Sequence, residues 1–308
     1  MRRGSLVLLL GLLSLAAPAG ASAHARSATV ALDYKLVLDP RVNAIGGLEV
    51  AILDGDRDLR LTALHGSTIT VLGDLGEPML RIAPTGTWVN RGSPTALAAK
   101  LSTSGRGWAR LSSGRSFTWH EHRLAPPPWR AGEARARFAV PLLVDGRRVA
   151  VSGTFVRHSR PELWPWALVA AGLVSLTVVA VRRGWAVATP LGAVAGAAAV
   201  AALVAFSVAD APNGRVAWTQ LGLGLFLAAV MFGLLVRSHG ARRTAVAGLL
   251  GAVAAAVSLG SIGVFRHGVV VSSLPALLAR LATAVALFGG AAAVVLAVLT
   301  PTNKGARR

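Results

Sequence analysis

The chain has 308 residues, of which 54% are hydrophobic, and its mean hydropathy of +0.58 is too high for an ordinary soluble protein. The apolar residues are concentrated in the C-terminal half, as in a membrane protein. A net charge of +19 could indicate nucleic-acid binding, but the arginines are dispersed, and those after residue 180 mostly lie between apolar runs. This placement favours a positive-inside membrane protein and no nucleic-acid partner.

The chain contains no cysteine and only three methionines. The absence of cysteine excludes disulfides, thiolate metal sites, a catalytic cysteine and a lipoprotein anchor. A methionine-rich Cu(I) site is also disfavoured, so any soft-metal site must depend on imidazole ligands.

Residues 1–23 have the pattern of a secretory signal peptide. Two arginines precede the apolar stretch Leu6–Ala17, and Ala21–Ala23 forms an A-x-A cleavage site. The apolar stretch is short for a membrane span, so we expect cleavage, with an uncleaved anchor as the alternative. Cleavage would make His24 the amino terminus and place residues 24–160 outside the cytoplasm.

Residues 24–160 are predicted to form an Ig-like β-sandwich, because seven or eight short strands fit into about 130 residues. The strongest signal is Asp145-Gly146 between the runs Ala136–Val144 and Arg147–Val156, since a type I′ hairpin turn needs positive φ at both central positions. Ser93–Gly114 is predicted as a long loop around a short strand. The other predicted strands are Thr29–Leu38, Leu48–Leu53, Leu59–Leu64, Thr68–Leu72, Met79–Ala83 and Thr87–Asn90.

Residues 24–160 contain 19 Lys and Arg against 11 Asp and Glu, a net charge of 19 − 11 = +8. In a cell envelope this charge favours anionic lipid headgroups or acidic wall polymers as partners. General solvation by arginine is the alternative explanation.

Residues 161–300 are predicted to form a transmembrane domain of five spans, each long enough to cross the hydrocarbon core. An odd number of spans after a cleaved signal leaves the tail, 301–308, in the cytoplasm. The basic residues agree, because the loops assigned to the outside carry only Arg215 and Arg266. The protein is therefore expected in the plasma membrane as a multi-pass protein. The predicted spans are 163–181, 186–208, 216–236, 244–265 and 274–299.

The predicted spans contain few charged or titratable residues. No Asp, Glu or His lies in a span core, which disfavours a proton- or ion-coupled transporter. Arg280 is the one charge well inside a span, and it could snorkel to the headgroups or contact an anion. Gly192 with Gly196, and Gly260 near Gly263, have the spacing of close helix packing.

The segment Phe117–Arg123 is where titratable side chains crowd together. On a strand, His120 and His122 would share one face and could bind one ion, while Glu121 would face the other way and pair with Arg123. The alternative is an ordinary strand with Trp119 in the core and no metal.

His24 would strengthen a metal site, because a free amino-terminal histidine offers both its amine and its ring to one ion. Nitrogen ligands in a tetragonal arrangement favour Cu(II). The predicted metal ligands are therefore His24, His120 and His122, with copper as the cofactor. No catalytic motif is present, so we do not expect an enzyme.

The amino-terminal His24, the β-rich region and the hairpin Val144–Phe155 resemble the periplasmic copper-binding CopC-type domains, some of which are fused to a membrane portion. The resemblance implies copper binding through His24 and Asp145. Arg147 stands where that family places its hairpin histidine, so His120 and His122 would have to substitute. Trp119–Arg123 also resembles a W-H-[DE]-H-R motif of uncharacterised actinobacterial membrane proteins.

Two functions follow. The first is a membrane-anchored extracytoplasmic metal-binding protein that sequesters Cu(II) or delivers it to another envelope or copper-handling protein. The second is a non-metal cell-envelope scaffold whose basic β-domain binds a protein, a lipid headgroup or a wall polymer. Transport by the five spans is a third and less favoured function.

Overall fold

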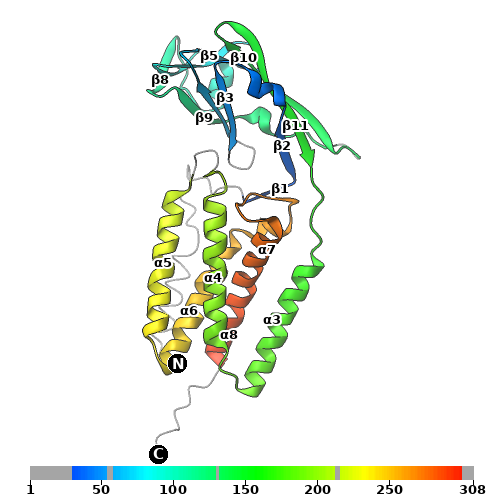
Figure 1. Cartoon of the computed structure of the whole chain (residues 1–308), viewed down its shortest axis with the longest axis vertical. Coiled ribbons are helices and arrows are strands. Elements are labelled where there is room, and N and C mark those ends of the chain that lie inside the picture. The colour runs from blue at the N-terminus through cyan, green and yellow to red at the C-terminus, as the bar shows by residue number, and fades with distance from the viewer. Residues whose placement is uncertain (1–29, 54–57, 130–131, 212–215, 300–308) are drawn as a thin grey trace, which may run out of the picture. The chain divides into compact units, whose positions relative to one another are not determined.

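The computed structural model describes residues 30–53, 58–129, 132–211 and 216–299, and Figure 1 shows the chain. The chain divides into two compact units. The β-rich unit is Leu32–Ser159, and the helical unit comprises the described residues from Arg160 onward together with Val30 and Ala31. The predicted signal peptide and His24 lie outside the described residues.

A seven-stranded antiparallel sheet forms most of the β-rich unit, in the order β2-β11-β10-β5-β6-β7-β8. Buried side chains alternate with more exposed ones along β10, so that one face is buried and the other faces solvent. The strands are β2 (Tyr34–Leu38), β5 (Ile69–Leu72), β6 (Pro78–Ala83), β7 (Gly86–Asn90), β8 (Trp108–Ser112), β10 (Arg135–Val144) and β11 (Arg147–Arg157).

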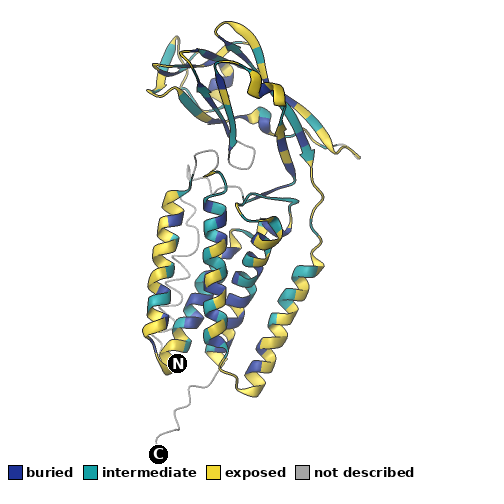
Figure 2. Cartoon of the chain, viewed as in Figure 1, coloured by how far each residue is buried: buried dark blue, intermediate teal, exposed yellow. Residues whose placement is uncertain are grey.

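A three-stranded antiparallel sheet, in the order β3-β4-β9, contacts the larger sheet through β4 with β6 and β9 with β7. The buried residues of both sheets form the core of the unit (Figure 2). Neither sheet closes on itself, and the Ig-like assignment stays a prediction. The strands are β3 (Leu48–Leu53), β4 (Asp58–Ala63) and β9 (Ser116–His120), and the short helical turns are η1 (Pro40–Ala44), α2 (Pro94–Ala98) and η2 (His122–Leu124).

The predicted hairpin between β10 and β11 is confirmed. Asp145 and Gly146 have φ of 49° and 79°, as a type I′ turn requires. The region Ser93–Gly114 contains the predicted short strand, β8, but also the unpredicted helix α2. That helix begins because the Ser93 hydroxyl accepts from the Ala96 N–H and Pro94 fits the first turn.

The helical unit has five helices that are long and apolar enough to cross a membrane, as predicted. The fourth predicted span, 244–265, begins and ends too late, because α6 runs from Gly240 to Leu259 and the chain continues as η4 (Ile262–Phe265) and β12 (Val269–Val270). The fifth span contains a π-helical turn, η5. The segments are α3 (Trp164–Arg183), α4 (Ala188–Ser207), α5 (Trp218–Arg237), α6 (Gly240–Leu259), and α7 (Ala276–Ala284), η5 (Val285–Gly289) and α8 (Gly290–Leu299).

Arg280 holds the connection between α6 and α7. Its Nε donates to the Val264 carbonyl at 2.8 Å, and its Nη2 donates to the carbonyls of His267 and Gly268 at 3.0 and 3.2 Å. These carbonyls lie in η4 and the turn that follows it, outside the α-helices, and the guanidinium donates to all three.

Glycines allow the helices to pack closely. A Cβ added at Gly192 would lie 2.4 Å from the Ala247 carbonyl oxygen, and one added at Gly290 would lie 2.4 Å from that of Gly251. Close packing at Gly192 and its neighbour Gly196 is therefore confirmed. The nearest atoms to a Cβ at Gly260 or Gly263 are 3.5 and 3.6 Å away, so these two glycines make only ordinary contacts.

We expect Gly290→Val to destabilise the helical unit by about 1–3 kcal/mol, because the new side chain must separate α8 from α6. The apparent free energy of unfolding in mixed SDS–maltoside micelles measures this effect. Gly222→Val is the matched control, since it makes the same change in an exposed helical position with nothing within 4 Å. Equal losses in the two variants would contradict the packing argument.

Candidate functional site

The candidate site begins at the end of strand β9, which pairs with β4. Leu59 lies opposite Trp119, and Asp58 lies opposite His120. Successive residues of a strand point to opposite faces, so Trp119 enters the core, where it is 4% exposed, and His120 faces solvent.

The strand ends at His120, and the chain then turns. Glu121 has extended backbone angles and caps η2, in which His122 is the first residue. Therefore His120 and His122 are not alternate residues of one strand, and the predicted shared face does not form. The structure differs here because the Glu121 side chain accepts from the Arg123 N–H at 3.1 Å, which closes a turn in place of another strand residue.

Glu121 is the centre of the site, with a side chain that is only 1% exposed. Its Oε1 accepts from Arg123 Nε at 2.7 Å, and its Oε2 accepts from Arg123 Nη2 at 2.7 Å and from the Trp119 indole Nε1 at 3.0 Å. The carboxylate and the guanidinium thus form a bidentate pair, the strongest geometry for these two groups. The predicted pairing of Glu121 with Arg123 is confirmed, whereas its burial was not predicted.

The environment keeps Glu121 ionised. Burial alone would raise the pKa of this carboxyl, but the hydrogen bonds and charge of Arg123, together with the Trp119 indole, outweigh burial and lower the pKa below its usual value. A carboxylate held this way is fully occupied as a hydrogen-bond acceptor within the protein.

Arg123 also connects the two sheets. Its Nη1 donates to the carbonyl of Leu72 at 2.9 Å, and Leu72 ends β5 of the seven-stranded sheet. Glu121 and Trp119 belong to the segment around β9 of the three-stranded sheet. The unit formed by Trp119, Glu121 and Arg123, here called the Trp–Glu–Arg unit, therefore connects the end of β9 to the end of β5.

The two imidazoles face different aspartates. The distance from His120 Nδ1 to Asp58 Oδ1 is 3.6 Å, and that from His122 Nε2 to Asp74 Oδ2 is 3.1 Å. The Asp74 N–H is itself held by the Thr95 hydroxyl of α2, at 2.8 Å. The histidine side chains are 43% and 52% exposed, so both remain accessible to solvent.

The predicted metal ligands are only partly within the described residues, because His24 is not. Among the residues that the structure describes, no three or more His, Cys, Asp or Glu side chains are grouped so that they could hold a metal ion. The site of His24, His120 and His122 stays a prediction.

Sequence reasoning missed a basic and aromatic row on the exposed face of the seven-stranded sheet. The strand registers place its members opposite one another on neighbouring strands from β11 to β8. Three of the six are exposed arginines and one is a half-buried tryptophan. In order across the sheet, the row is Arg148, Leu143, Thr70, Arg81, Trp88 and Arg110.

A second tryptophan, Trp108, extends this row. The six residues of the row together with Trp108 are here called the Arg–Trp face. Trp108 lies opposite Asn90 in the same sheet, and the Arg81 guanidinium lies over its ring at 4.4 Å from the centroid. Arg110 is steadied by a hydrogen bond from its Nη2 to the Thr85 carbonyl at 2.9 Å. The sequence shows these arginines and tryptophans on separate strands, but only the register across the strands places them in one row.

No family model, curated protein or solved structure matches this chain. The resemblances to CopC-type domains and to actinobacterial membrane proteins therefore stay predictions.

We expect Glu121→Gln to destabilise the β-rich unit by about 3–5 kcal/mol, because it leaves the Arg123 charge without its partner in a buried position. Adding Arg123→Met should recover much of this loss, since the double variant has no unpaired charge and the introduced amide still offers Trp119 an acceptor. Hydrogen-exchange protection of β4 and β9 in the full chain measures both effects. A loss of no more than about 0.5 kcal/mol for Glu121→Gln would contradict a buried ion pair.

Proposed function

We propose that the protein is a membrane-anchored cell-envelope scaffold whose Arg–Trp face binds an anionic polymer. The observation that carries this proposal is the row of Arg148, Arg81 and Arg110 across one exposed sheet face, interleaved with tryptophan. The occupied carboxylate of Glu121 supports it as well, because the W-H-E-H-R segment then has a structural role.

The side chains of this face suit a polymer with repeated negative charges. Arginine binds phosphate and carboxylate through two parallel hydrogen bonds, and a tryptophan ring offers a flat apolar surface beside it. Neighbouring strands are about 4.8 Å apart, so Arg148 and Arg81 are separated by roughly 14 Å, and Arg81 and Arg110 by roughly 10 Å. Charges at these intervals would contact separate groups of one extended chain.

The proposal includes the location and the processing of the chain. The signal peptide would be removed after Ala23, the β-rich unit, as an Ig-like sandwich, would lie outside the cytoplasm, and the C terminus would lie inside. The basic residues support this orientation, because Arg182-Arg183 at the end of α3 and Arg242-Arg243 at the start of α6 would be cytoplasmic. The five helices would then act as the anchor.

The test removes the three arginines of the Arg–Trp face. We expect Arg81→Gln/Arg110→Gln/Arg148→Gln to weaken binding of poly(glycerol phosphate) by at least about tenfold, because three charge-assisted contacts are lost. Binding is measured on the full chain in zwitterionic nanodiscs, with anionic nanodiscs as a second arm for a lipid-headgroup partner.

The matched control removes the same charge elsewhere. Arg41 and Arg115 are exposed, and Arg60 is half-buried on β4 of the other sheet. We expect Arg41→Gln/Arg60→Gln/Arg115→Gln to have a much smaller effect. If the two triple variants lose equal affinity, net charge and not the Arg–Trp face determines binding.

We propose Cu(II) binding by His24, His120 and His122 as a second function, which would serve copper sequestration or delivery to a partner protein. Its support is the accessibility of both described imidazoles, each beside a carboxylate that could orient the ring. The Trp–Glu–Arg unit would then hold the segment that carries them.

Cu(II) titration of the full chain with its processed terminus tests this second function. If the assignment is right, His120→Ala and His122→Ala each weaken binding by about tenfold or more, as loss of one ligand or its orienting partner does. His65→Ala is the matched control, since His65 lies in a turn elsewhere in the unit. Copper binding that the first two variants leave unchanged would reject the ligand set.

A further inference from the structure

The helical unit contains a cavity of about 440 Å³ among α4, α5 and α6. This volume lies within the range of about 300–1,000 Å³ that is typical of ligand pockets. Small residues on all three helices face it, among them Gly196, Gly224 and Ala254.

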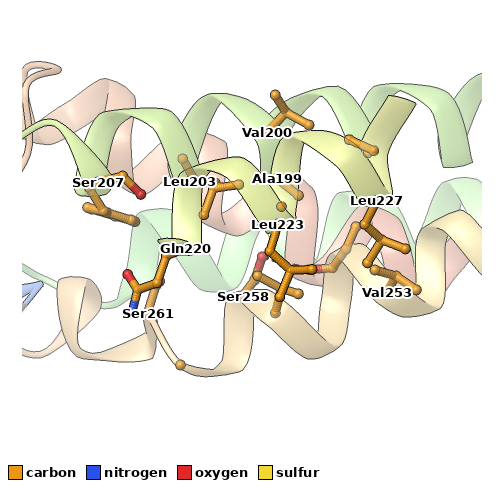
Figure 3. A pocket seen from close by; sticks show the side chains of 18 of the residues that line it. Ala199, Val200, Leu203, Ser207, Gln220, Leu223, Leu227, Val253, Ser258 and Ser261 are labelled. Carbon is orange, nitrogen blue, oxygen red and sulfur yellow. Dashed lines mark hydrogen bonds between the residues drawn. The ribbon is translucent and has the colours of Figure 1, made fainter. Parts of the chain in front are cut away.

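The cavity has a polar end and an apolar end (Figure 3). Ser207, Gln220 and Ser261 lie toward one end, whereas Leu227 and Val253 lie toward the other. The Ser258 hydroxyl, between them, donates to the Ala254 carbonyl of its own helix, so it does not make the middle of the cavity polar. This distribution matches an amphiphile and not a uniformly polar substrate.

The length of the cavity matches one leaflet of a bilayer. Ser207 is the last residue of α4 and Gln220 the third of α5, so the polar end lies at the ends of these helices. Gly196 and Met231 line the other end. Gly196 lies eleven residues before Ser207 in α4, and Met231 lies eleven residues after Gln220 in α5, a distance of about 16 Å at 1.5 Å per residue. Half of a hydrocarbon core is about 15 Å.

The cavity also opens to the side. Leu223 lines it, yet this side chain is 69% exposed on the outer surface of α5. At the apolar end of the cavity lies a buried cluster of Met231, Leu235, Ala247 and Leu250. A chain-like ligand could therefore enter from the bilayer and extend as far as this cluster.

We propose that this cavity binds one acyl chain of a membrane lipid, with the ester and glycerol end of the lipid at Ser207, Gln220 and Ser261. The amide of Gln220 and the two hydroxyls can hydrogen-bond ester and glycerol oxygens, and they carry no charge to select a particular headgroup. The apolar lining surrounds the acyl chain, which has no polar group that needs a hydrogen-bond partner. The inference depends on the five spans and not on the proposed polymer binding.

The test uses a phosphatidylcholine with a diazirine at the end of one acyl chain, in nanodiscs with the full chain. Photolysis followed by peptide mapping should place label near Met231 and Leu250, at the closed end. Ala228→Phe fills the cavity and should reduce that label by about tenfold, because the phenyl ring takes the space of the acyl chain. Ala229→Phe is the matched control, since Ala229 is exposed and does not line the cavity.

A second pair of variants controls for a folding defect caused by the large introduced side chain. Ala199 lines the cavity from α4, and Ala201 is exposed on the same helix, so Ala199→Phe and Ala201→Phe should differ in the same way. Label that is equal in both members of each pair, or that falls only on exposed helix surfaces, overturns the proposal. Photocrosslinks from residues 1–23 to the cavity lining, with no lipid label there, also overturn it, because a segment of the chain would then be the occupant.

Discussion

The β-rich unit depends on the requirement that a buried charge must be fully paired. Glu121 is almost completely removed from water, and it remains ionised because Arg123 and Trp119 occupy both of its oxygens. Through Arg123 the same carboxylate positions the end of β5, so one ion pair connects both sheets. The two histidines are placed on either side of it as a consequence.

This arrangement separates structural from binding chemistry in the unit. Glu121 and Arg123 bind each other inside the protein, whereas the Arg–Trp face consists of side chains that nothing in the sequence groups together. The helical unit shows the same separation. Arg280 is used to hold a connection, and the space that could take a ligand is lined by apolar and uncharged residues.

Local features of the fold could be predicted and long-range ones could not. The Asp145-Gly146 hairpin and the five spans follow from residue types over short windows, and the structure has them. The connection of the segment after β9 to β5 could not be predicted, because Arg123 bonds to the carbonyl of Leu72, 51 residues away. The Arg–Trp face likewise requires the register of six strands, and the cavity requires the packing of three helices.

Hydrogen exchange of the Trp119 indole N–H, followed by NMR in the full chain, tests the central claim most directly. The account predicts slow exchange, because this N–H donates to a buried carboxylate. It also predicts that Glu121→Gln accelerates the exchange, because the variant removes the ion pair and so destabilises the Trp–Glu–Arg unit. Fast exchange in the unaltered protein would contradict the account, because Glu121 would then be exposed to solvent and its oxygens would not be held by Trp119 and Arg123.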